Sequence, residues 1–146
     1  MFGIIISAAE ALFDKFKDIG LLFARLLVAY GFLDPALNKW NNIEGVAGWF
    51  ESIGIPFPLL NTYMAASTEI LGVVLLALGL FTRYISVPLI IVMIVAIVTV
   101  HLPHGFAAGE NGFEIPLYYI GFLILFIGHG AGKISVDNFI FKKDAI

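Results

Sequence analysis

The stretch STEILGVVLLALGLFTRYISVPLIIVMIVAIVTVH, residues 67–101, decides the fold class because it is almost entirely apolar. Its only Asp, Glu, Lys or Arg residues are Glu69 and Arg83. A helix needs about 20 apolar residues to cross the hydrocarbon core of a bilayer. We therefore expect two membrane spans that meet at Arg83, over about residues 58–81 and 84–100, with Glu69 near the middle of the first.

The rest of the chain has the same character. Hydrophobic residues make up 60% of the sequence and charged residues 13%, against about 45–50% and about 25% in ordinary soluble domains. Two further apolar segments, over about residues 19–37 and 113–129, predict a first and a fourth span. The sequence therefore predicts an all-α membrane protein with a four-transmembrane-helix bundle, formed by a single integral membrane domain over residues 1–146.

Two shorter helices are expected at the membrane surface. In residues 2–18, polar side chains recur at helical spacing, which is typical of an amphipathic helix lying on the bilayer. In residues 42–53, between spans one and two, a short interfacial helix is expected, with Asn41 and Glu44 spaced as in a capping box. Pro35 is expected to kink or end the first span.

The distribution of basic residues predicts the orientation. With four spans, one side of the membrane holds six Lys or Arg residues, whereas the opposite loops hold only Lys39. The six are Lys15, Lys17, Arg83, Lys133, Lys142 and Lys143. Basic residues favour the cytoplasmic side. We therefore expect a multi-pass protein in contact with the lipid bilayer, with both termini cytoplasmic.

Composition also excludes several kinds of chemistry. The chain has no cysteine, so it offers no thiol nucleophile, disulfide or thiolate ligand. The net charge of −3 comes with no basic cluster, so nucleic acid is not an expected partner. No nucleophile elbow, phosphate-binding loop or dinucleotide fingerprint is present.

Two charges within the predicted spans are the strongest candidates for a functional site. An arginine or an acid at the centre of a span costs about 2.5–3.5 kcal/mol, so Arg25 and Glu69 are expected to face each other. Helical rise places them about 9 Å apart in depth, which long side chains, a tilt or a bridging water could span. The pair is either a structural salt bridge or a polar site for a quinone headgroup, a proton or a small substrate.

The segment after the third span carries a second group of candidates. His101, His104 and Glu114 are expected near the outer interface, where imidazole and carboxylate could bind Cu(II) or Zn(II). A histidine pair with no fixed third ligand is a weak metal signal, so a metal is disfavoured. The other interpretations are hydrogen bonds to the loop backbone, or a proton relay and contact with a ligand headgroup.

Five motifs follow one another along the chain: ARLLVAYGFLDPALNKW, GVAGWFESIGIPFP, STEILGVVLLALGLFTRY, VAIVTVHLPHGF and GHGAGKISVDNF. Their order and spacing resemble the DoxX family of bacterial membrane proteins. Together they cover about residues 19–140. The family's functional positions match Arg25, Lys39, Glu69, His101, and Gly132, Ser135 and Asp137 of the terminal motif. The chain departs from many members at Asp34 and Pro35, where they have His-Gly, so any role of that histidine is in doubt here.

The resemblance implies a four-helix protein of the bacterial inner membrane, similar to the membrane subunit of a thiosulfate:quinone oxidoreductase. A first hypothesis follows: a quinone-linked oxidoreductase component in which Arg25, Glu69 and His101 are catalytic, and Lys39, Thr68 and Glu114 contact the quinone. No covalently bound cofactor is expected, and a protein partner would supply the redox centre.

The second hypothesis is a non-catalytic membrane accessory, because other members of the family accompany small metal-binding peptides. Such a protein would anchor or transport a partner protein or a copper-related peptide, and its buried charges would serve the architecture. A protein partner or a homo-oligomer is expected in either case.

Overall fold

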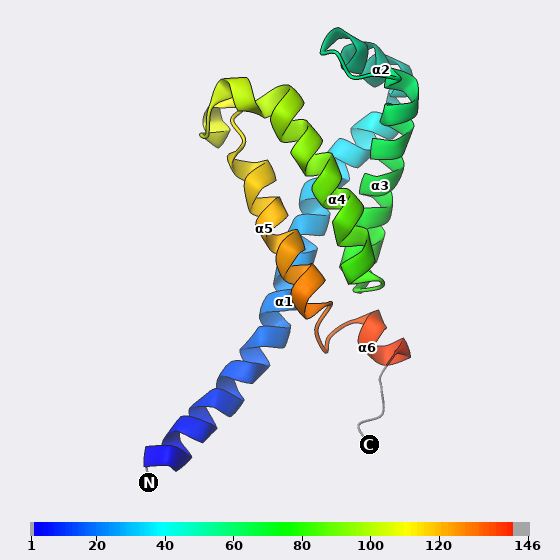
Figure 1. The fold of residues 1–146 in the computed structure, drawn as a ribbon. Helices are drawn as coiled ribbons and strands as arrows, with labels where there is room; N and C mark the ends of the chain where they lie inside the picture. Colours follow the sequence, from blue (N-terminus) through cyan, green and yellow to red (C-terminus); the bar gives the residue numbers. More distant parts are fainter. Residues whose placement is uncertain (1, 142–146) are drawn as a thin grey trace.

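The computed structural model describes residues 2–141, and within that range it contains helices and no strand. A long helix and a short one come first, followed by an antiparallel pair, a run of short turns and a last apolar helix (Figure 1). The elements are α1 (Phe2–Asn41), α2 (Ile43–Ser52), α3 (Pro58–Leu78), α4 (Thr82–Ala96), the π-helix η1 (Ile97–His101), the 3₁₀ helices η2 (Leu102–His104) and η3 (Ala108–Glu110), α5 (Glu114–His129) and α6 (Val136–Ile140).

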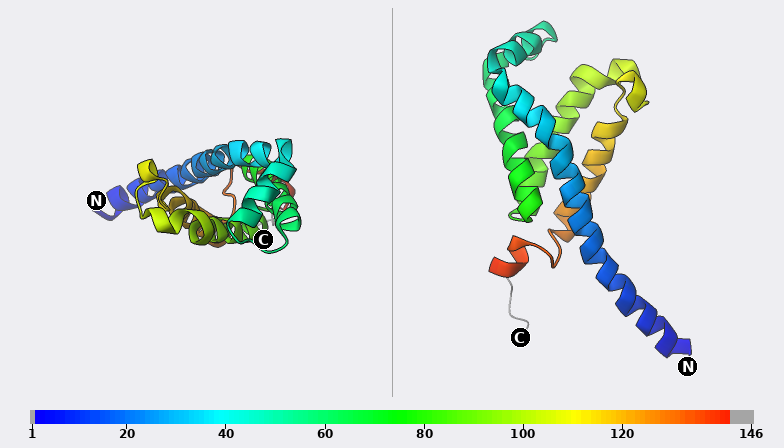
Figure 2. Two further views of the ribbon diagram at one scale, coloured as in Figure 1. Left: turned by 90° about the horizontal axis from the view of Figure 1, so that it is seen from above. Right: turned by 180° about the vertical axis from the view of Figure 1, so that it is seen from behind.

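The helices form two packed pairs, α1 with α3 and α4 with α5. The pairs come together near the turn between α3 and α4 and diverge toward the opposite end of the molecule (Figure 1). At that wider end, seen from above, α2 and the η segments lie at opposite ends of an elongated ring of helices (Figure 2). The N-terminal half of α1 extends beyond the bundle on the narrow side.

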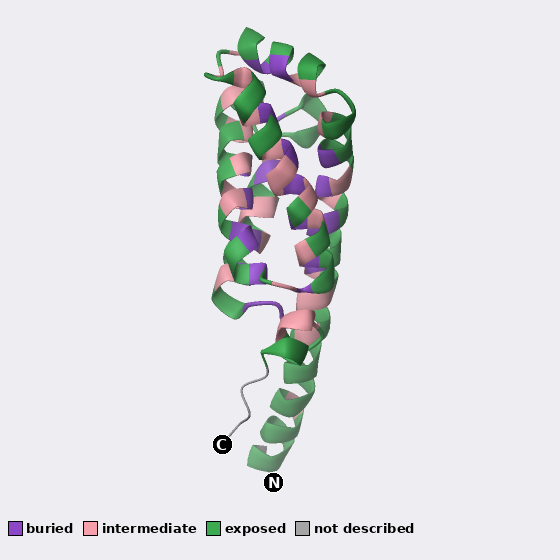
Figure 3. Ribbon diagram, turned by 90° about the vertical axis from the view of Figure 1, so that its right-hand side faces the viewer, coloured by how far each residue is buried: buried purple, intermediate pink, exposed green. Residues whose placement is uncertain are grey.

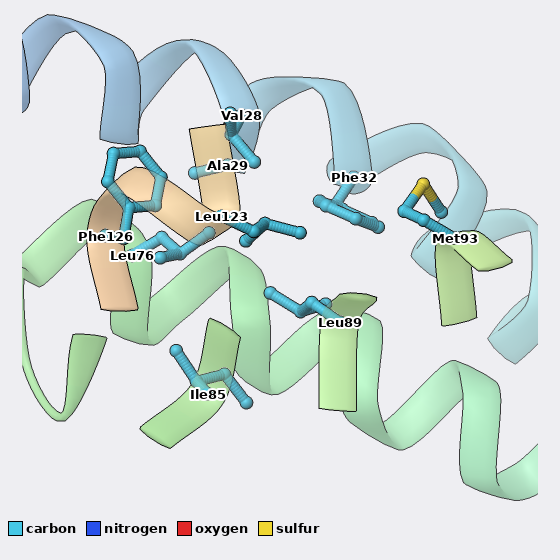
Figure 4. Close-up of a cluster of buried hydrophobic side chains, with 9 residues drawn as sticks. All are labelled: Val28, Ala29, Phe32, Leu76, Ile85, Leu89, Met93, Leu123 and Phe126. Atoms are coloured by element: carbon cyan, nitrogen blue, oxygen red, sulfur yellow. The ribbon is translucent and has the colours of Figure 1, made fainter. Parts of the chain in front are cut away.

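An apolar core joins the two pairs where they converge. All four long helices contribute to it, and its side chains interlock between the helices (Figure 4). The buried members are Val28, Ala29, Phe32, Leu76, Ile85, Leu89, Met93, Leu123 and Phe126. Toward the outside, the same helices expose long rows of large apolar residues (Figure 3), a surface suited to lipid rather than to water.

Within residues 2–141, three helical segments are long and apolar enough to cross a membrane: Gly3–Asn41, Pro58–Leu78 and Thr82–His104. Helix α5 is also apolar but has 16 residues, about 24 Å, whereas the hydrocarbon core is about 30 Å thick. The expected all-α membrane bundle is therefore confirmed.

The structure corrects the expected division at the N-terminus. Residues 2–18 and 19–37, expected as a surface helix and a span, form the single helix α1, which continues through Pro35 to Asn41. Asp18 and Gly20, residue types that often begin or end a helix, lie near the expected boundary, yet α1 continues through both. At 40 residues, α1 is about 60 Å long, roughly twice the hydrocarbon thickness.

Helix α2 forms close to the expected residues, but its cap differs. The N-cap is Asn42, whose side-chain oxygen accepts a hydrogen bond from the Gly45 amide at 3.2 Å, and not Asn41, which still belongs to α1. The third span also ends differently, because α4 gives way at Ile97 to a π turn and then to a 3₁₀ turn at Leu102–His104.

Candidate functional site

A cavity of about 750 Å³ lies between the two helix pairs, toward their diverging end. Apolar side chains from α1, α2, α3, α4, η1 and α5 form most of its wall. The polar side chains in the wall are Lys39, Asn61, Thr68, Glu69, Thr99, His101, Asn111 and Tyr119. A largely apolar pocket of this size with a few polar groups is typical of a small-molecule site.

The polar centre of the cavity is an ion pair between Lys39 and Glu69. Lys39 Nζ donates to Glu69 Oε2 at 2.9 Å, and the Glu69 side chain is only 2% exposed against 18% for Lys39. The α1 helix carries Lys39 alongside α3 because it does not end at Pro35, and the Trp40 indole fixes this register by donating to the Ala66 carbonyl at 3.2 Å. This pair replaces the expected one between Arg25 and Glu69.

Arg25 lies outside the cavity wall and binds backbone instead of a carboxylate. It is fully buried, and its guanidinium donates through Nη1 to the Leu76 carbonyl at 2.9 Å and through Nη2 to the Ile134 carbonyl. Leu76 is two helical turns beyond Glu69, about 10 Å along α3, so the difference in depth keeps the two charges apart. Arg25 thereby ties α1 and α3 to the segment that precedes α6.

The terminal motif closes the narrow end of the bundle. Asp137 accepts hydrogen bonds from the Phe81 and Thr82 amides at 2.8 and 3.3 Å, which caps the start of α4. Ser135 caps α6 by accepting from the Asn138 amide at 3.2 Å. Gly79, in the left-handed region with φ of 68°, leaves room for the Arg25 guanidinium, which a Cβ there would strike. The motif therefore has a structural role that spacing alone did not reveal.

His101 reaches the cavity because η1 is a π turn. Counting about 100° per residue, an uninterrupted α-helix would place residue 101 about 140° away from the cavity-lining Ala96; the wider turn brings it back to the wall. Its Nδ1 lies 2.8 Å from the Asn111 carbonyl oxygen. A carbonyl only accepts, so Nδ1 donates in this contact, and Nε2 is then an acceptor when the ring is neutral. A π turn at a functional site is a recurrent association.

The other predicted residues divide between the cavity and the loop. Thr68 lies in the cavity wall, whereas Glu114 and His104 do not. Glu114 holds the loop before α5 by accepting from the Ala108 amide at 2.9 Å and from the Tyr118 hydroxyl at 3.0 Å, and His104 is exposed. Within residues 2–141, no three His, Asp or Glu side chains are grouped in a way that could hold a metal ion.

Sequence reasoning missed Tyr119 and Asn61 as parts of the wall. Tyr119 approaches α1 at Gly31, where a Cβ would overlap the phenol ring, and its ring packs on Phe32 with a centroid distance of 5.5 Å. Gly31 is the one sequence signal that could have indicated this close approach. Asn61 donates to the Pro56 carbonyl, a local contact with no periodic signature.

The cavity therefore offers complementary polar groups within an apolar wall. Lys39 can donate, the second carboxylate oxygen of Glu69 and Nε2 of His101 can accept, and the Thr68 hydroxyl can do either. The paired charges cancel, so the arrangement suits a neutral ligand that has both a polar headgroup and an apolar body.

Comparison with known proteins gives the family. The sequence model of the DoxX family matches residues 20–102. Putative oxidoreductase CatD of Bacillus subtilis is 32% identical over 88% of this chain and 92% of its own length, and inner membrane protein YphA of Escherichia coli is 30% identical over 86% and 94%. Uncharacterized membrane protein Rv3486 of Mycobacterium tuberculosis is 34% identical over 82% and 80%. No solved structure matches. The chain is a membrane protein and belongs to the DoxX family.

Proposed function

We propose that this protein is the membrane component of a quinone-linked oxidoreductase and that its cavity holds the quinone headgroup beside the Lys39–Glu69 pair. The observation that carries the proposal is a buried ion pair in the wall of a largely apolar cavity of about 750 Å³. An ionic pair at membrane depth is costly, which supports a functional role for it. The name of the Bacillus subtilis relative, putative oxidoreductase CatD, points in the same direction.

The polar groups fit both redox states of such a ligand. A quinone carbonyl accepts from Lys39, and a quinol hydroxyl donates to Glu69 or to Nε2 of His101, while Thr68 contacts either form. Reduction of a quinone takes two electrons and two protons. Glu69 and His101 are placed to carry the protons, and the electrons come from the redox centre of a partner protein, since the chain has no cysteine of its own.

In this proposal Arg25 has no contact with the ligand. Its two carbonyl partners hold the narrow end of the bundle closed, so it positions α1 and α3, which carry Lys39 and Glu69. The residues that touch the quinone are those in the cavity wall, and Glu114 supports them by ordering the loop that begins α5.

The proposed topology has α5 as a fourth span and both termini in the cytoplasm of a bacterial cell, with the protein in the inner membrane. The turn after α3 and the segment before α6 then lie on the cytoplasmic side with Arg83 and Lys133, whereas α2 and the loop before α5 lie outside. Lys142 and Lys143, which support the same orientation, lie outside the described residues.

The test measures quinone binding to the full-length protein in lipid nanodiscs, by titration with a decyl-tailed benzoquinone and by native mass spectrometry. Glu69→Gln should weaken binding by about tenfold or more, the equivalent of about 1.4 kcal/mol, whereas Glu51→Gln should not. Glu51 is a matched control because it is exposed on α2 and outside the cavity wall.

A second pair of variants guards against loss of folding. Ala65→Phe fills the cavity and should abolish binding, while Ala77→Phe makes the same change on an exposed position of α3 and should be neutral. Equal binding by the wild type, Glu69→Gln and Ala65→Phe would contradict the proposal. Retention of lipid alone by the wild type would favour the non-catalytic accessory.

A further inference from the structure

The cavity is open on its side toward the bilayer, between α3 and α4. Met64 of α3 and Ile91 and Val95 of α4 line the cavity, yet they are 58%, 58% and 44% exposed. A side chain that both lines a cavity and is exposed outside lies on its rim. The rim between α3 and α4 is therefore made of three flexible or branched apolar side chains, and none of them is polar.

The depth of this rim follows from the hairpin. Helices α3 and α4 run antiparallel from the turn at residues 79–81, so positions equally far from the turn lie at the same level. Met64 and Val95 are each about 15 residues from the turn, about 23 Å along their helices, and Ile91 about 17 Å. In a hydrocarbon core of about 30 Å, the rim opens onto lipid chains and not onto the aqueous phase.

Several contacts place the gap between these two helices. Leu89 fills the space beside Gly72, where an added Cβ would lie 2.8 Å from the Leu89 side chain. Helices α3 and α4 are therefore in close contact at this level, nearer the turn. Beyond this contact the pairs diverge (Figure 1). On the opposite side of the cavity, the Tyr119 ring packs against α1 at Gly31 and Phe32 and narrows the space between α1 and α5 at that level. Nearer the wide end, Pro35 of α1 and Ile115 of α5 also line the cavity and are exposed.

The geometry points to a lateral portal between α3 and α4, through which a quinone enters from the bilayer and in which its isoprenoid chain stays. This inference rests on the proposed function and names the ligand class more closely: a long-chain quinone, with its headgroup at Lys39–Glu69 and its chain between Met64, Ile91 and Val95. Thr68 and Glu69 are about 17 Å from the turn, at the level of Ile91, so a headgroup at the pair can send its chain straight out through the rim.

The test combines chain length with portal variants in nanodiscs. A benzoquinone with a decyl chain is compared with the same headgroup without a chain. Two quantities are measured: the binding affinity, referred to the concentration of each compound in the membrane, and the association rate. Met64→Trp and Val95→Trp narrow the portal and should slow association of the decyl compound by about tenfold. Leu71→Trp and Ile94→Trp, exposed on the same two helices but outside the cavity wall, are matched controls and should leave the rate unchanged.

A decyl-tailed quinone with a photoreactive group at the end of the chain gives an independent readout. Crosslinks at Met64, Ile91 or Val95 that unlabelled quinone displaces would support the portal. It would also be supported if the two portal variants no longer bound the decyl compound more tightly than the chainless one. Displaceable crosslinks confined to α1 and α5, or portal variants with wild-type rates, would overturn the portal but leave the quinone proposal standing. Crosslinks that phospholipid displaces and quinone does not would overturn both.

Discussion

At the scale of single residues, the Lys39–Glu69 pair bears on the stability of the bundle and lies at the centre of the proposed ligand site. Glu69 is 2% exposed and its one charged partner within residues 2–141 is Lys39, at 2.9 Å. Removing one member of a buried pair leaves an uncompensated charge and costs about 3–5 kcal/mol, whereas removing both together can be close to neutral. The pair is therefore costly to keep, which is consistent with the proposed role in the cavity.

A double-mutant cycle tests this coupling. Lys39→Met should lower the free energy of unfolding by about 3 kcal/mol because the Glu69 carboxylate loses its partner. Adding Glu69→Gln should recover at least about 1 kcal/mol of that loss, measured by reversible unfolding in mixed micelles. Lys133→Met is the control, since Lys133 is 79% exposed in its 3.8 Å pair with Asp18 and should cost less than about 1 kcal/mol. Additive single effects would contradict the coupling.

Arg25 makes a second residue-scale prediction. Its guanidinium serves two carbonyls, of Leu76 and Ile134, from one planar group, a geometry that a lysine ammonium cannot reproduce. Arg25→Lys should leave a buried carbonyl without a donor and cost about 1–3 kcal/mol, seen as a lower Tm in nanodiscs. Arg83→Lys, at an exposed position in the first turn of α4, should leave the Tm unchanged. An unchanged Tm for Arg25→Lys would show that the two carbonyl contacts do not hold the bundle together.

At the scale of elements, the structure depends on how helices begin and end. Helix α4 starts at Thr82 after a residue in the left-handed region, Phe81, with no cap from its own side chains. Asp137 supplies the cap from a segment more than fifty residues away, by accepting from the Phe81 and Thr82 amides. The carboxylate also lies at the positive end of the helix dipole. One side chain thus links α6 to the start of α4, beside the backbone hydrogen bond from the Asp137 amide to the Gly79 carbonyl at 2.9 Å.

Asp137→Ala should remove this cap and cost about 1–2 kcal/mol, and it should loosen the attachment of α6 to the turn between α3 and α4, where only the backbone hydrogen bond to the Gly79 carbonyl would remain at this residue. Faster hydrogen exchange at the Phe81 and Thr82 amides would report the release directly. Asp137→Asn keeps an acceptor and should lose less. Asp14→Ala, on the exposed N-terminal part of α1, is the control, and exchange at Phe81 and Thr82 that is as slow in Asp137→Ala as in that control would contradict the capping role.

The elements also show what a single sequence can predict. The apolar runs of α3, α4 and α5 were predictable because lipid demands about 20 consecutive apolar residues or nearly so. The continuity of α1 and the π turn at Ile97–His101 were not, because neither a helix that continues through Pro35 nor a turn that is one residue wider has a pattern in composition. Both features act on the site, the first by carrying Lys39 to Glu69 and the second by turning His101 to the cavity.

The sequence could predict that the buried charged residues have partners, but not which partners they have. That Arg25 and Glu69 would each find a partner follows from the cost of a lone charge in lipid. Glu69 pairs with Lys39 because of the level at which α1 places Lys39 beside α3, and Arg25 binds two backbone carbonyls. Residue types alone predict neither contact. Every residue carries a backbone carbonyl, so the tertiary fold decides which carbonyls accept from Arg25.

At the scale of the whole molecule, the two helix pairs form a wedge. The shared core of Val28, Leu89, Leu123 and their neighbours holds the narrow end together, and Arg25 and Asp137 close that end from the loop side. The wide end is left to the cavity and its ion pair. This division gives the protein a packed base and, in the proposal, a site that opens to the bilayer, as a lipid-soluble ligand would require.

The last prediction concerns the membrane topology and depends on whether α5 crosses the bilayer. The chain has no cysteine, so single cysteines can be placed at the exposed positions Ser7, Gly109 and Asn138 and labelled with an impermeant maleimide in intact spheroplasts and in inverted vesicles. If α5 crosses the membrane, Gly109→Cys labels in spheroplasts, and Ser7→Cys and Asn138→Cys label only in inverted vesicles. If α5 does not cross the membrane, Asn138→Cys labels in spheroplasts, as Gly109→Cys does. The second result would place both sides of the α5 segment in one compartment and would remove the fourth wall that the cavity needs within the bilayer.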